Sequence, residues 1–345
     1  MPLTPAWPLL LLAGAYSAVA GFEVGGNLMG GLVSARAFTL LGAALILLAG
    51  AATAPWIVGT AVARTIVFSI VALPRLGPAV YLEALLAALA VLGGCWWRGL
   101  PTSTTLALVG ALAGAGLGAA GPRGVVWGQV WRVLAGMVAA LALGAAAGGV
   151  VSRLLRRLLR HADEGAPAAL RGLQAATGLL QGFGYGSNDA EKAVGLFALV
   201  GAWQTAGGRT LLLAGHLPVP AWSVWGAILT FGLGMALGGA RVAHTVGFGL
   251  YRVRAGDALA AQLAAGVTVL LAASAGAPVS SGQTATAALF AAGAARRLSL
   301  PRWSIARRIA LTWLITLPLA LALGAALATA AHLLGVSGTL GGLAG

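Results

Sequence analysis

The stretch that decides the fold is QGFGYGSNDAEKAVGLFALV, residues 181–200, in which Asp189, Glu191 and Lys192 interrupt an otherwise apolar run. Ionisable side chains within a membrane span are expensive and rare, and they mark functional sites by default. The stretch therefore predicts polar residues with a function inside a membrane-spanning part of the chain.

The composition extends this prediction to the whole chain. Of 345 residues, 59% are hydrophobic and 8% are charged, against about 25% charged in soluble domains. The chain is therefore predicted to be an all-α polytopic membrane protein. The 20 Arg and one Lys outnumber seven acidic residues, which gives a net charge of +14. The basic residues cluster beside apolar runs, as topology signals do, so a nucleic-acid-binding surface is excluded. The single Cys95 excludes a disulfide framework and a Cys-rich metal site.

Hydropathy and breaker residues divide the chain into membrane spans. The predicted spans are 5–24, 38–54, 55–73, 79–97, 127–150, 172–190, 193–213, 222–240, 258–276 and 304–330. Two more apolar stretches, at about 100–118 and 277–295, begin with proline or hydroxyl residues, which suit a helix start better than lipid exposure. Each is predicted to be a re-entrant hairpin, and two plain spans with polar ends are the alternative.

The distribution of arginines predicts the topology. Only Arg123 and Arg132 follow the first hairpin, whereas the second is followed by Arg296, Arg297, Arg302, Arg307 and Arg308. The basic loop at 152–171 should be cytoplasmic, because positive loops face the inside. An inverted repeat of about five spans plus one hairpin per half, 1–151 and 172–345, explains the pattern and places both termini outside.

The two halves share a motif. GFEVGGNLMG from Gly21 aligns without gaps with GSNDAEKAVG from Gly186, so that Glu23 matches Asn188 and Asn27 matches Lys192. The hairpins align likewise, with Ser103 on Ser280 and Thr104 on Ser281.

These segments resemble the signatures of the inorganic phosphate transporter (PiT) family. GSNDAEKAVG, PTSTTLALVGALAGAG and APVSSGQTATAALFAAG carry the resemblance, which covers nearly the whole chain. It implies an inverted repeat with re-entrant hairpins, transport of phosphate with Na+ or H+, and a homodimer. The chain departs from the family pattern at Glu23-Val24, which replaces Asn-Asp, and at Gln262, which replaces an acid that Glu83 keeps in the first half.

Consecutive hydroxyls at a helix start suit an oxyanion, because O–H groups and unpaired backbone N–H groups converge there. The predicted phosphate-binding residues are Ser103, Thr104, Thr105, Asn188, Asp189, Ser280 and Ser281. The alternative is that the hydroxyls only cap helices or join them.

The acids are candidates for cation coupling. Asp189 and Asn188 have oxygens suited to Na+, and Asp189 could instead carry a proton or pair with Lys192, three residues later. Glu23, with Asn27 four positions on, and Glu83 are further candidates for coupling. The roles of Lys192 and Gln283 stay open.

The predicted function is therefore a symporter for inorganic phosphate in a bacterial inner membrane, without a cofactor. The alternatives are a transporter of another oxyanion such as sulfate, and a degenerate, non-transporting paralogue or sensor. An enzyme is not expected, because Ser103 and Ser280 have no His nearby in sequence and no metal-ligand cluster occurs.

Overall fold

The computed structural model describes residues 6–34, 38–72, 76–77, 79–98, 100, 102–158, 166–249, 251 and 253–335. These residues form helices and connections, and their one extended contact is an isolated bridge between Val71 and Val125. The helices are α1 Ala6–Ser34, α2 Leu40–Ile57, α3 Ala61–Phe68, α5 Ala79–Trp97, α6 Thr104–Ala120, α7 Trp127–Leu158, α8 Ala166–Tyr185, α9 Glu191–Trp203, α10 Ala206–Leu213, α11 Ala221–Gly249, α12 Ala255–Ser274, α13 Ser281–Ala294 and α14 Trp303–Leu333. The predicted all-α class is confirmed.

Several helices are suited to a bilayer. Six in the described part of the chain, α2, α5, α6, α7, α12 and α14, are long and apolar enough to cross a membrane. Large apolar side chains such as Val138, Leu143 and Leu314 are exposed on their outer faces. Lipid tails are apolar, so exposed apolar side chains cost nothing there. The helices also satisfy their backbone hydrogen bonds internally, as a membrane requires. The chain is a membrane protein.

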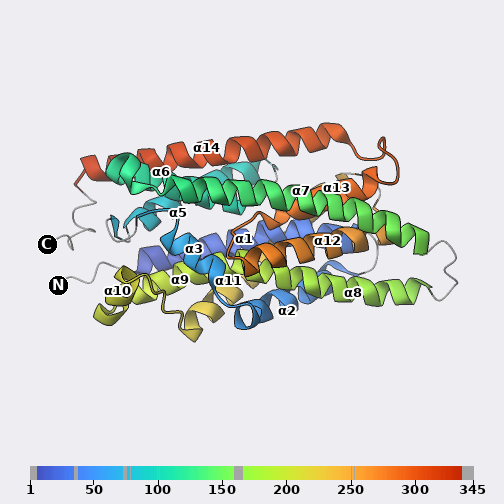
Figure 1. Cartoon of the computed structure of the whole chain (residues 1–345), viewed down its shortest axis with the longest axis horizontal. Helices are drawn as coiled ribbons and strands as arrows, with labels where there is room; N and C mark the ends of the chain where they lie inside the picture. The colour runs from blue at the N-terminus through green and yellow to red at the C-terminus, as the bar shows by residue number, and fades with distance from the viewer. Residues whose placement is uncertain are drawn as a thin grey trace.

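Two helical hairpins enter the molecule from opposite ends. Helices α5 and α6 lie toward the left end of Figure 1, and α12 and α13 toward the right end. The second arms of the two hairpins begin next to each other inside the molecule, where Ser103 contacts Ser280.

The hairpin turns lie earlier in the chain than predicted. The stretches 100–118 and 277–295 each contain one helix, the second arm of a hairpin whose first arm was predicted to be a full span. The hydroxyl runs begin these helices, as predicted. The Gly- and Ala-rich α6 stays a single helix because α5 and α14 cover it.

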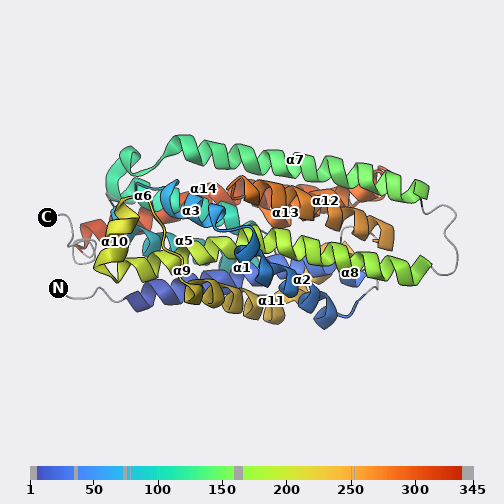
Figure 2. The ribbon, with the colours of Figure 1, turned by 60° about the horizontal axis from the view of Figure 1, so that its bottom comes forward.

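Other span boundaries were also wrong. The predicted span 55–73 is divided between the end of α2, at Ile57, and the eight-residue α3, because Gly59 breaks the chain at a φ of +94°. The predicted spans 172–190 and 193–213 instead share one helical segment, α8 to α9, joined by a π-helical turn at Gly186–Ala190 (Figure 2). Its polar residues are buried in protein, so they need not end the helix. Helices α7 and α8 also take up both edges of the predicted loop 152–171.

Each hairpin packs against the last helix of the other half of the chain. Helix α14 lies along α6, and α7 lies along α13 and α12, while α1 pairs with α11. Glycines allow these approaches: a Cβ on Gly114 would lie 2.1 Å from the Leu321 carbonyl oxygen, and one on Gly148 would lie 2.5 Å from that of Ala288. Small residues let membrane helices pack closely in this way.

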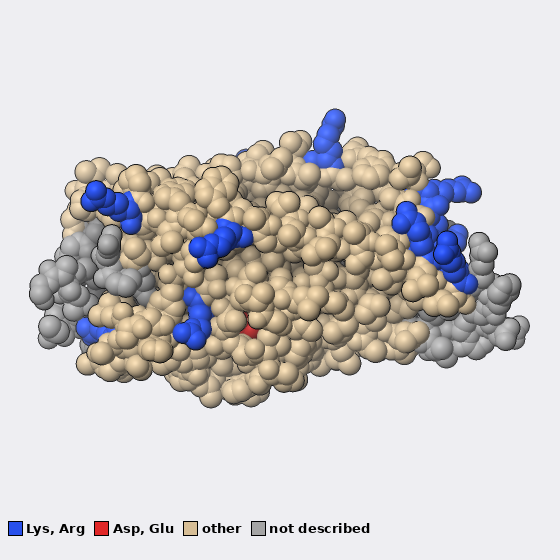
Figure 3. All heavy atoms as spheres, viewed as in Figure 1, with Lys and Arg blue, Asp and Glu red and all other residues tan. Residues whose placement is uncertain are grey.

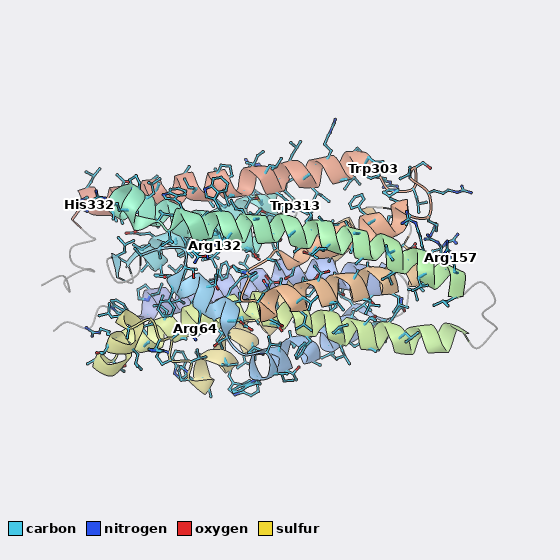
Figure 4. All side chains as sticks on the ribbon, viewed as in Figure 1. Arg64, Arg132, Arg157, Trp303, Trp313 and His332 are labelled. Carbon is cyan, nitrogen blue, oxygen red and sulfur yellow. The ribbon has the colours of Figure 1, made fainter. Side chains whose placement is uncertain are left out.

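Positive charge gathers at one end of the molecule. Figure 3 shows a group of basic side chains at the right and single basic side chains scattered over the rest of the face. Arg157 and Trp303 lie at that end and His332 at the other (Figure 4). We call it the arginine end, and its described basic residues include Arg153, Arg156, Arg157, Arg254, Arg296, Arg297 and Arg302. The basic end of α7 and the basic segment after α13 thus lie together, and Arg156 donates to the Ala295 carbonyl oxygen at 2.9 Å.

Candidate functional site

Two helix starts face each other where the hairpins meet. Ser103 precedes α6 and Ser280 precedes α13, and both are buried. The Ser103 hydroxyl donates to Ser280 Oγ at 2.8 Å and accepts from the Leu106 N–H at 3.2 Å. Helix N-termini carry partial positive charge and unpaired N–H groups. Their meeting therefore creates an environment suited to an anion.

Lys192 joins both hairpins to α9. Its Nζ is fully buried and donates to Thr105 Oγ1 at 2.6 Å, to Asp189 Oδ1 at 2.7 Å and to the Val279 carbonyl oxygen at 3.1 Å. Thr105 Oγ1 donates to the same carbonyl at 2.8 Å. An ammonium has three donors, so all of them are used. The pairing of Asp189 with Lys192, an alternative at the level of sequence, is present in the structure.

The π-helical turn at Gly186–Ala190 carries Asn188 and Asp189. Such turns are rare and occur often at functional sites. A Cβ on Gly186 would lie 2.3 Å from the Ala51 carbonyl oxygen of α2, so glycine is required for this approach. Asn188 Nδ2 donates to the Ala277 carbonyl oxygen at 3.1 Å. The turn thus lies against the tip of the second hairpin.

Three buried oxygens beside these contacts have no hydrogen-bond partner: Asn188 Oδ1, Asp189 Oδ2 and Ser281 Oγ. A buried polar atom without a partner costs free energy and calls for an explanation. Hard cations prefer oxygen ligands of this kind. The three atoms offer a carboxylate, an amide and a hydroxyl oxygen to a small cation, and the carboxylate also offers a place for a proton.

The remaining candidates make no side-chain hydrogen bond to Lys192, Ser103 or Ser280 among the described contacts. Thr104 is buried, and its carbonyl oxygen accepts from the Tyr16 hydroxyl at 3.2 Å. Gln283 is buried in the first turn of α13. Glu23 in α1 and Glu83 in α5 are buried too, and Glu83 Oε2 lacks a partner. The side chain of Asn27 lies outside the described residues.

Sequence reasoning missed several contributors. The Tyr185 hydroxyl donates to the Ser281 carbonyl oxygen at 2.9 Å, and Tyr16 meets the first hairpin as described. Tyr185 directly precedes the Gly186 motif, and this position in the sequence was the only indication that it could contribute to the site. Glu191 accepts from the Val62 N–H at the start of α3, at 3.0 Å, and so ties α3 to α9.

Comparison with known proteins finds relatives along most of the chain. The profile of a family described as "Phosphate transporter family" matches residues 20–324. A probable low-affinity inorganic phosphate transporter of Rhizobium meliloti is 30% identical over 76% of this chain and 77% of its own length. One of Bacillus subtilis is 28% identical over 92% of this chain and 94% of its own.

A solved structure has the same fold. "The sodium-dependent phosphate transporter" superimposes with a TM-score of 0.78, covering 94% of this chain and 99% of that one at 22% identity. At this identity the similarity concerns the arrangement of helices alone.

Proposed function

Because the chain belongs to the phosphate transporter family, we propose that it is a secondary symporter that carries inorganic phosphate across the membrane with Na+ or H+. The observation that carries the proposal is the buried contact of two helix starts, Ser103 against Ser280, beside the Asp189–Lys192 pair. Both the names of the relatives and the sodium-dependent neighbour support it.

Phosphate binds between the hairpin tips in this proposal. Its oxygens replace the Ser103–Ser280 hydrogen bond, so that both hydroxyls and the helix N-termini donate to the anion. Thr104, Thr105 and Ser281 extend this set of donors. Lys192 already contacts Thr105 and thus supplies a positive charge next to the anion. The donors that phosphate needs after losing its water are then present in the protein.

The coupling cation binds beside the anion. Asp189 Oδ2, Asn188 Oδ1 and Ser281 Oγ are its proposed ligands if it is Na+, and Asp189 is its acceptor if it is H+. Glu83, with a buried and unpartnered oxygen, and Glu23 are proposed as further proton carriers, together with Asn27, four residues after Glu23 in the sequence. A monoanionic phosphate carries an O–H group that can donate to a carboxylate, whereas sulfate has none. A carboxylate in the site therefore favours phosphate over sulfate.

The orientation follows from the charges. We propose that the arginine end is cytoplasmic, since positive loops face the inside. The start of α1 and the end of α14 lie at the opposite end (Figure 1), which is then outside. The two hairpins, entering from opposite ends, support an inverted repeat about the site.

Uptake by purified protein in liposomes tests the function. With labelled phosphate outside, an inward gradient of either Na+ or H+ should drive accumulation, and the effective gradient identifies the cation. No accumulation with either gradient would contradict the symporter. Excess sulfate should compete weakly; strong competition would favour the broader oxyanion transporter.

A further inference from the structure

Polar side chains follow one face of α8 from the arginine end to the site. They are Gln174, Thr177, Gln181 and Tyr185, spaced by three, four and four residues, and Asp189 follows four residues later. Residues at such spacings share a helix face. At 1.5 Å per residue the four span about 16 Å. We call these four, together with Gln262 of α12, the polar row.

The polar row faces α12. Gln174 Nε2 donates to the Ala255 carbonyl oxygen at 3.2 Å, and Thr177 Oγ1 donates to Gln262 Oε1 at 2.8 Å. The Gln181 side chain lies beside the Tyr185 hydroxyl, which itself contacts the second hairpin. The row therefore lines the contact between α8 and the first arm of the second hairpin.

Two of its amides have unused hydrogen-bonding atoms. Gln181 Oε1 and Gln262 Nε2 have no partner, although the two residues are only 3% and 2% exposed. Hydrogen bonds between helices can stabilise a membrane protein and would account for Gln174 and Thr177. Such hydrogen bonds do not account for the unpartnered acceptor of Gln181 and the unpartnered donor of Gln262. An apolar side chain at either position would avoid the cost of burying an unpaired polar atom.

At the arginine end the row meets a cluster of charges. Asp257, two residues after the carbonyl that Gln174 contacts, accepts from Arg296 at 2.9 Å, and Arg156 lies 4.0 Å away. The Ser152 hydroxyl of α7 lies 3.5 Å from Asp257 Oδ1. The cluster ties α12 to α7 and to the segment after α13.

We propose that the polar row lines the half of the transport route between the phosphate site and the arginine end, and that the Asp257 cluster closes that half. This rests on the proposed function. Amides and hydroxyls are uncharged and both donate and accept. The same side chains can therefore donate to an anion and accept from a cation, and without a charge they bind neither ion tightly.

The route is closed in this structure. A Cβ on Gly184 would lie 2.7 Å from the Gly266 carbonyl oxygen, and one on Gly266 would lie 3.0 Å from Gln181 Cα. Helices α8 and α12 therefore touch at their backbones next to Gln181. Opening requires the second hairpin to move away from α8, which exposes the row to water.

Thiol labelling tests the route. The only cysteine, Cys95, is first replaced by alanine, and Thr177→Cys or Gln181→Cys is added. A charged, membrane-impermeant thiol reagent should modify both from the arginine end and not from the other. The matched control is Leu179→Cys, at similar depth on a lipid-exposed face of α8, which should stay unmodified. Labelling from the opposite end, or none at either row position, overturns the proposal.

Removing the amides tests the row by a second readout. Gln181→Leu and Gln262→Leu should each lower the maximal uptake rate at least about tenfold while phosphate binding to purified protein changes less than about threefold. Gln181→Asn, which keeps an amide, should recover part of the rate. Parent-like uptake by both leucine variants overturns the proposal. If the parent protein moves no phosphate, the proposed function fails. The labelling experiment still tests whether the polar row is accessible from the arginine end.

Discussion

Asp189 is a buried carboxylate with one oxygen held by Lys192 and the other without a partner. Asp189→Asn should abolish coupled phosphate uptake, because an amide neither balances a cation nor carries a proton. It also leaves the Lys192 ammonium buried without its counterion, which costs about 3–5 kcal/mol of stability. Uptake and thermal unfolding of the variant measure the two effects. Normal uptake would make Asp189 a structural residue only.

Lys192 is expected to bind the anion in addition to its pairing with Asp189. Lys192→Met removes the buried charge and its hydrogen bond to Thr105, so phosphate affinity of purified protein should fall at least about tenfold.

The control for this variant is the pair Asp189→Asn with Lys192→Met, which removes both charges. It should recover thermal stability relative to either single variant without recovering phosphate binding. Recovered binding would show that the lysine serves only to neutralise Asp189.

At these residues, sequence was informative where two halves could be compared. The hydroxyl runs predicted that Ser103 and Ser280 correspond, and the structure places them in contact. The choice of Lys192 partners was not predictable, since it depends on the Val279 carbonyl and on Thr105, which belong to different hairpins. Only tertiary packing brings these groups to one ammonium.

Among the elements, helix α6 depends on glycine for its contact with α14. Gly114→Ala places a methyl group 2.1 Å from the unmodified position of the Leu321 carbonyl oxygen, so the helices must separate. We expect a loss of about 1–3 kcal/mol of stability or more, seen as a lower Tm in detergent. Gly94→Ala in α5 is the control, because nothing lies within 4 Å of its added Cβ. An unchanged Tm for Gly114→Ala would contradict the close contact.

Element boundaries were less predictable than element type. Apolar runs identified helices such as α2 and α5 within a few residues, but hydropathy does not distinguish a helix in lipid from a buried arm of a hairpin. Helix α6 reads as a span by composition, yet most of it is buried in protein. Its role depends on α14, which lies far away in sequence.

The whole molecule has two chemically different ends, and this makes its orientation testable. In the Cys95→Ala background, Leu298→Cys lies in the exposed connection between α13 and α14, and His332→Cys lies near the opposite end (Figure 4). An impermeant thiol reagent should label the first only from the cytoplasm and the second only from outside. The reverse result would invert the orientation, and labelling of both from one side would contradict the fold.

The exchange of final helices between the halves has a consequence for biogenesis. Helix α6 is synthesised early, but α14, against which it packs, is the last helix described. At ordinary translation rates the ribosome needs roughly 10 to 40 s to reach the end of α14 after α6 is made. During that interval the glycine face of α6 has no protein neighbour on that side. The first hairpin therefore completes its folding only when synthesis is nearly finished.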